Sequence, residues 1–91
     1  MMALLDMLKI DLGITGTAYD TRLSEYLTAA QQSIIAEGAA TLDTTNAEDA
    51  GLVVMYAAWT FRRRDTMDAM PRMLRFKLNN RIFREKMQEE T

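Results

Sequence analysis

Residues 47–64 contain the feature that most restricts the fold, a helix-compatible segment that is apolar on nearly every side. Between Leu52 and Phe61 only Thr60 is polar. A helix on a protein surface has apolar residues along one stripe, so a helix that is apolar all round must be covered by other segments. We therefore predict that this segment forms the central helix of the domain.

The segments before it have the patterns of covering helices. Residues 2–12 form a short apolar segment that ends at Gly13, a residue type suited to closing a helix. Residues 20–37 place apolar side chains at helical spacing along one stripe. Thr17 stands three residues before Asp20, a spacing that predicts a capping box at the start of this second helix.

The rest of the chain predicts one more helix and two connections. Residues 38–46 are small and polar and predict a loop, whose last residue, Asn46, is placed to cap the central helix. Residues 65–70 predict a linker, and Pro71 suits the first turn of the final helix.

Strands are not expected, because no alternation of polar and apolar residues is sustained. Residues 1–91 are therefore predicted to form a single all-α domain, a small bundle of about four helices around a buried third helix. The predicted core residues are Leu23, Leu27, Ile34, Val54, Trp59 and Phe61.

The residue types present exclude several classes of site. The chain has no Cys and no His, which excludes disulfides, Cys/His zinc sites and His-activated nucleophiles. No apolar run approaches the ~20 residues that span a bilayer. The N-terminal segment carries Asp6 within its apolar run and no basic leader, unlike a secretory signal. We expect a non-enzymatic protein that is made in the cytoplasm, without a cofactor, a metal or a membrane partner.

Charge is distributed unevenly along the chain, although the formal net charge is only −2. Residues 1–61 contain two basic and eight acidic side chains, whereas residues 62–91 contain nine basic and five acidic ones. An acidic first part and a basic last part favour binding to acidic partners or to other copies of the chain. Helix faces that are simply exposed to solvent would show the same imbalance.

The helix after Pro71 is predicted to carry two apolar stripes when its residues are placed at ~100° intervals. The first stripe, which also includes Asn80, consists of Met73, Phe76, Phe83 and Met87. The second, with Glu85 at its lower end, consists of Leu74, Leu78 and Ile82. The gaps between the stripes are basic. They contain Lys77, Arg81 and Arg84 on one side and Arg72, Arg75 and Lys86, with Asn79, on the other.

One stripe can pack on the central helix, and the other needs a different cover. We predict that the second stripe forms the interface with a neighbouring subunit or a partner. The predicted interface residues are Leu74, Leu78, Ile82, Arg75 and Arg81. In the alternative arrangement, the first two helices clasp the final helix from both sides within one subunit.

Other basic residues are candidates for contact with DNA phosphates or with acidic partner surfaces, and the sequence leaves both roles open. These residues are Arg62, Arg63, Arg64, Arg72, Lys77 and Arg84.

The order of these elements resembles the small head–tail connector, or adaptor, proteins of tailed bacteriophages. "LLDMLKIDLGIT" resembles the opening helix of that family, and "YDTRLSEYLTAAQQSI" resembles its second helix. "AGLVVMYAAWTFRRRD" is similar to its apolar third helix, which ends in an aromatic residue followed by Arg. "MPRMLRFKLNNRI" is similar to its final segment, although Arg72 and the basic residues after Pro71 stand where the family often has small or apolar residues.

The resemblance implies a virion protein without enzymatic activity, assembled in the host bacterial cytoplasm. Family members form rings of identical subunits, commonly dodecameric. Such a ring binds below the portal protein, extends the DNA channel and provides a docking platform for stopper or tail-completion proteins. Contact with the packaged DNA would be non-specific. A ring requires a heterologous interface, in which one surface of a subunit meets a different surface of the next.

Two other interpretations remain. Residues 8–27 have the order of a helix-turn-helix, which favours a small DNA-binding regulator. The exposed positions of its second helix lie in the acidic half and include few donors for phosphates or base edges, as at Arg22 and Gln32. A general helical interaction protein, such as a small inhibitor or scaffold, would have the same fold.

Overall fold

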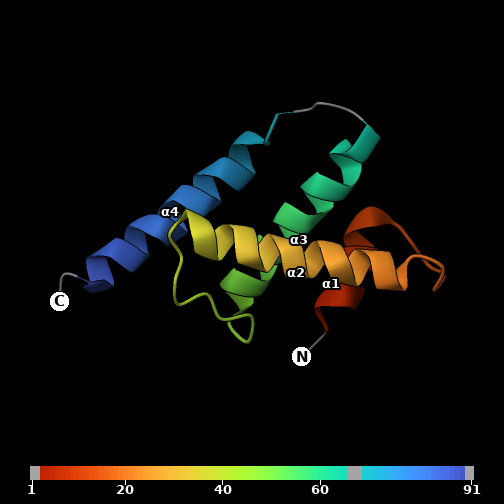
Figure 1. Cartoon of the computed structure of the whole chain (residues 1–91), viewed down its shortest axis with the longest axis horizontal. Coiled ribbons are helices and arrows are strands. Elements are labelled where there is room, and N and C mark those ends of the chain that lie inside the picture. The colour runs from red at the N-terminus through yellow and green to blue at the C-terminus, as the bar shows by residue number, and fades with distance from the viewer. Residues whose placement is uncertain (1–2, 66–68, 90–91) are drawn as a thin grey trace.

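The computed structural model describes residues 3–65 and 69–89 of the chain, and this part contains helices and no strand. The elements are α1 (Leu4–Leu12), α2 (Asp20–Glu37), α3 (Ala47–Arg62), the short 3₁₀ helix η1 (Arg63–Asp65) and α4 (Arg72–Glu89), as Figure 1 shows. The prediction of an all-α fold is confirmed.

Local chemistry explains where the helices begin and end. Gly13 closes α1 in the left-handed region, at φ 74°. The side chain of Asn46 caps α3 and accepts hydrogen bonds from the backbone N–H groups of Glu48, at 2.8 Å, and Asp49, at 3.2 Å. Both features agree with the sequence patterns.

The predicted capping box of α2 is wrong. The residue before α2 is Tyr19, and no side chain caps the helix there. Asp20 instead accepts a hydrogen bond from Lys9 Nζ at 2.8 Å, in an ion pair between α2 and α1. The carboxylate that would have supported Thr17 is therefore occupied by a cation on another helix.

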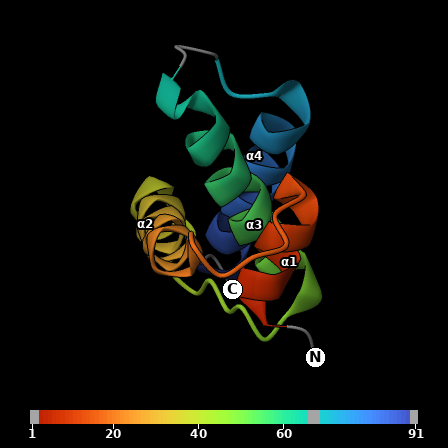
Figure 2. The ribbon, with the colours of Figure 1, turned by 90° about the vertical axis from the view of Figure 1, so that its right-hand side faces the viewer.

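Helix α3 is the central element. Its buried residues lie on several sides of the helix, and include Leu52, Val53, Ala57, Ala58 and Phe61. Helix α2 lies on one side of α3 and helix α1 on the other, with α4 alongside (Figure 2). The all-round apolar pattern of α3 is thus explained by neighbours on several sides.

The predicted core residues lie in or beside one apolar cluster. Leu23, Leu27 and Ile34 of α2 and Val54 and Phe61 of α3 are buried. Trp59 is only half-buried and packs at the edge of this cluster. Its ring stands edge-on to Tyr56, with centroids 5.5 Å apart and planes at 89°.

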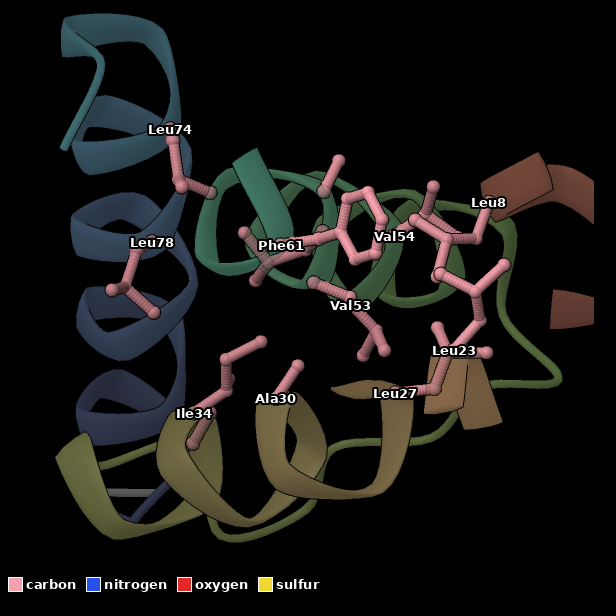
Figure 3. Packing of buried hydrophobic residues seen from close by; sticks show 14 residues of the cluster. Leu8, Leu23, Leu27, Ala30, Ile34, Val53, Val54, Phe61, Leu74 and Leu78 are labelled. Atoms are coloured by element: carbon pink, nitrogen blue, oxygen red, sulfur yellow. The ribbon is translucent and has the colours of Figure 1, made fainter. Parts of the chain in front are cut away.

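Helix α4 joins the core through the stripe that was predicted to bind a neighbour. Leu74 and Leu78 are 1% and 0% exposed and belong to the core cluster, and Leu74 points toward α3 in Figure 3. Ile82 is half-buried against the same cluster. Burial of each leucine stabilises the fold by about 1.5–3 kcal/mol. The prediction that this stripe forms an intermolecular interface is therefore wrong for Leu74 and Leu78, which the subunit itself covers, and Ile82 is covered in part.

Helices α3 and α4 run in opposite directions, and the C-terminal end of α4 projects from the body of the molecule (Figure 1). The molecule is accordingly elongated and flat, with extents of 46 × 32 × 18 Å. Of the predicted linker 65–70, residues 66–68 lie outside the described part. The carbonyl of Pro71 accepts the first hydrogen bond of α4, from Arg75 N–H at 3.0 Å. In the described part, none of the helices has the length and apolarity that crossing a membrane requires.

Candidate interaction surface

A buried ionic cluster fixes the rotation of α4 on the core. Arg81 donates from Nε to Asp49 Oδ1 of α3 at 2.9 Å, and from Nη1 to Glu85 Oε1, one turn further along α4, at 3.1 Å. Arg81, Asp49 and Glu85 are 7%, 5% and 3% exposed. A charged trio with this little access to water requires mutual pairing, so α4 cannot rotate without separating it.

Thr41, in the loop between α2 and α3, completes the cluster. Its backbone N–H and its hydroxyl both donate to Glu85 Oε1, at 2.9 and 2.7 Å, and Arg81 Nη2 donates to its hydroxyl oxygen at 3.2 Å. The bonds from the Thr41 N–H and hydroxyl, followed by Arg81, hold the pKa of Glu85 below its ordinary value of 4.5. Burial disfavours the charged form of Arg81, but its bonds to Asp49 and Glu85 outweigh this and raise its pKa.

The structure separates the two arginines that were predicted to lie in the interface. Arg81 is buried in the cluster, so its prediction as an interface residue is wrong. Arg75 is exposed, and its Nη1 lies 3.4 Å from Glu37 Oε1 of α2 in an ion pair at the surface. It ties α4 to α2 only weakly, because exposed ion pairs contribute about 0–1 kcal/mol.

The other stripe of α4 faces away from the core. We call it the α4 seam, and it consists of Met73, Phe76, Asn80, Phe83 and Met87. Its four apolar residues are 58%, 62%, 63% and 53% exposed, in the order Met73, Phe76, Phe83 and Met87. Scattered exposed apolar residues are normal, whereas four along one face of one helix are typical of an interaction surface.

Basic side chains border the α4 seam on both sides. Arg72, Lys77, Arg84 and Lys86 are all exposed. Arg84 Nη1 also lies 3.0 Å from Glu48 Oε2 of α3, in an exposed ion pair. The surface of α4 thus combines an apolar strip with a positive border, which suits a partner that is apolar and acidic.

A groove of about 790 Å³ runs beside the seam, between α1, α3 and α4. Leu52 and Met55 of α3 line it, together with Ile10 of α1 and Phe83 of α4. Ile10 is 68% exposed, so apolar surface is available on both the α1 side and the α4 side. Lys77, Asn80 and Arg84 line the α4 side of the groove, which makes it continuous with the seam, and Asp11, Glu48 and Asp49 line it from α1 and α3.

The arginines at the end of α3 form a separate basic group. Arg62 Nη2 donates to the backbone carbonyl of Asp11 at 2.9 Å. The guanidinium carbons of Arg63 and Arg64 lie 4.3 and 3.9 Å from the ring centroids of Trp59 and Phe61. All three arginines are exposed. Of the predicted contact residues, Arg62, Arg63 and Arg64 therefore lie at one end of α3, whereas Arg72, Lys77 and Arg84 lie along α4.

In the described part of the chain, no group of three or more acidic residues is placed to hold a metal ion. The buried carboxylates of Asp49 and Glu85 are both occupied by Arg81. The paired charges of this cluster therefore serve packing.

Sequence reasoning missed the residues that orient α4. The sequence pattern places Glu85 at the end of a predicted apolar stripe and gives no sign that Asp49 of α3 lies beside it. The available signal was the i, i+4 spacing of Arg81 and Glu85, which pairs opposite charges on one helix face. An ion pair on the face that also carries Leu74 and Leu78 indicated a buried cluster rather than an open surface.

No protein-family model matches the chain, and neither a curated protein nor a solved structure is significantly similar to it.

Proposed function

We propose that the chain is a structural subunit of the head–tail connector of a tailed bacteriophage and acts without catalysis. The observation that carries this proposal is the α4 seam, a row of exposed apolar residues with basic borders on a helix whose opposite stripe is buried. A surface of this kind serves assembly. The order of the four helices, which resembles that of connector proteins, also supports the proposal.

In this function, identical subunits form a ring, dodecameric by the resemblance, at the interface between head and tail of the virion. The ring contacts the portal protein on one side and a stopper or tail-completion protein on the other. The acidic first part of the chain and its basic last part suit head-to-tail contacts between neighbouring copies. With Leu74 and Leu78 buried, the seam takes the role of the exposed interface with the portal, stopper or tail-completion protein.

The group Arg62–Arg64 supports contact with packaged DNA or with an acidic partner surface. Aromatic rings hold two of these guanidinium groups at the end of α3, where they remain exposed. DNA in a channel is contacted through phosphates, which requires positive charge and no base recognition.

The seam supports a second function equally, that of a helical interaction protein outside a virion, such as a small inhibitor or scaffold. The two functions differ in the size of the assembly. A connector forms a ring with a portal protein, whereas an inhibitor or scaffold forms a small complex of fixed composition.

The mass of the purified chain, alone and mixed with the portal protein of the same phage, tests the proposal. Native mass spectrometry and sedimentation velocity both report this mass. We expect a ring-sized complex in the mixture. A chain that remains monomeric beside an intact portal, at concentrations well above those of virion assembly, would contradict the connector function.

A further inference from the structure

The residues of the α4 seam follow a heptad repeat. Met73, Phe76, Asn80, Phe83 and Met87 are separated by three, four, three and four residues. This spacing is that of the a and d positions of a coiled coil, in which apolar residues recur every 3.5 residues on average. The core-facing residues Leu74, Leu78, Arg81, Ile82 and Glu85 occupy other heptad positions. The seam therefore has the spacing of a coiled-coil face, and the subunit leaves it exposed.

The positions that flank this face carry one sign of charge. The g positions hold Arg72, Asn79 and Lys86, and the e positions hold Lys77 and Arg84. In coiled coils, charges at e and g select the partner and its orientation. The seam has four cations and no acid at these positions. Arg84 is also paired with Glu48 of α3, and the other three cations favour a partner with acidic flanks.

A second copy of α4 does not meet this requirement. In a parallel pair, Arg72 of one copy would face Lys77 of the other. In an antiparallel pair, each flank would face its own equivalent. Both arrangements place like charges opposite each other, which disfavours pairing.

The acidic half of the chain does not supply the partner helix either. Helices α1, α2 and α3 use their apolar stripes in the core of their own subunit. Among their described residues, the large apolar side chains left exposed are single ones, Ile10 of α1 and Ile35 of α2. The occupant is therefore a helix of another protein.

The groove beside the seam widens the contact surface for such a helix. A helix on the Phe83 side of the seam would also cover Met55 and face Ile10 across the groove. Two heptads are short for a free coiled coil. Here α4 is already folded and Arg81 attaches it to the core. The free energy of forming this helix is therefore not subtracted from the free energy of binding.

We propose that the α4 seam and its groove bind one acidic amphipathic helix of a partner protein in a coiled-coil arrangement. The inference rests on the proposed function in that this helix would belong to the portal, stopper or tail-completion protein. Asn80, at the central a position, would fix the register of the pair, as single polar residues do at such positions.

Binding of two designed peptides to the full chain tests this inference. Each peptide has three heptads with Leu at a and d. One has Glu at every e and g position, and the control has Lys there. Fluorescence anisotropy should show that the Glu peptide binds at least about tenfold more tightly than the Lys peptide in low salt. This difference should shrink in high salt, where exposed charges are screened. Absence of binding by the Glu peptide, or equal affinity for both peptides, would overturn the inference.

Three variants locate the binding surface. Phe76→Ser/Phe83→Ser should abolish binding of the Glu peptide, because it removes both d residues of the seam. The control Ile35→Ser removes an apolar side chain of α2 that is 43% exposed, and it should bind as the wild type does. Arg72→Glu/Lys77→Glu/Lys86→Glu should prefer the Lys peptide. Retained binding by the first variant, or an unchanged preference in the third, would contradict this surface.

The mass measurements separate this inference from the proposed function. A ring with the portal but no binding of the Glu peptide would overturn the coiled-coil inference and leave the connector function standing. Binding of the Glu peptide without formation of a portal complex would support the coiled-coil inference and contradict the connector function.

Discussion

Arg81 determines which side of α4 faces the core. Its guanidinium joins α4 to Asp49 of α3 and bonds to Glu85 and Thr41, all within the interior. Lys77 and Arg84 flank it on the helix but remain exposed. Arg81 is thus structural, whereas Arg72, Arg75 and Arg84 of the same helix are exposed.

Replacement of Arg81 tests this assignment against a matched residue of the same helix. Arg81→Ala should lower the free energy of unfolding by about 3–5 kcal/mol, because it leaves Asp49 and Glu85 buried without a counter-charge. Arg75→Ala removes only an exposed pair with Glu37 and should cost less than about 1 kcal/mol. Urea denaturation followed by circular dichroism measures both. Similar losses in the two variants would show that the Arg81 cluster is not buried in solution.

Glu85 gives the stability of the domain a defined dependence on pH. Its pKa is lower in the folded protein than its ordinary value of 4.5, so the folded state favours the carboxylate. The resulting stabilisation is present above about pH 4.5 and is lost as the pH falls through the lowered pKa. Glu85→Gln removes the charge, so the stability difference between wild type and variant should be largest at neutral pH and shrink in acid. A difference that stays constant from pH 7 to pH 3 would contradict this coupling.

At the scale of the elements, the sequence predicted the helices well because each has its own local signal. These signals involve residues that are close together in the sequence. They are the apolar stripe of α2, Gly13 at the end of α1 and Asn46 at the start of α3. The orientation of α4 has only one weak local signal, the i, i+4 spacing of Arg81 and Glu85. Its two stripes are both apolar, and the stripe with Phe and Met, which are usually buried side chains, is the exposed one. The pairing of Arg81 with Asp49, distant in sequence, decides between them.

Two glycines test the packing between elements. Gly51 lies within α3, and a Cβ there would have no atom within 4 Å. Gly51→Ala should therefore stabilise the domain by about 0.5–1 kcal/mol. Gly38 ends α2 at φ 137°, and a Cβ there would lie 3.0 Å from Ile82 Cγ2 of α4. Gly38→Ala should destabilise the domain by about 1–3 kcal/mol. Thermal unfolding measures both changes, and stabilisation by Gly38→Ala would contradict the close contact of α2 with α4.

At the scale of the whole molecule, α4 connects the fold to the proposed function. Its buried stripe and ionic cluster attach it to α3, and its seam continues into a groove bordered by α1. Its C-terminal end projects from the body, where another protein can approach it (Figure 1). The basic residues after Pro71, apart from the buried Arg81, are thus presented on one helix.

The division of α4 into a buried and an exposed stripe is tested most directly by the free energies of unfolding of two double variants. Phe76→Ser/Phe83→Ser, in the seam, should stay within about 1 kcal/mol of the wild type, since both rings are more than half exposed. Leu74→Ser/Leu78→Ser, in the buried stripe, should lose at least about 4 kcal/mol and leave the chain largely unfolded. A seam variant that loses as much stability as the leucine variant would show that the α4 seam belongs to the core and offers no surface to a partner.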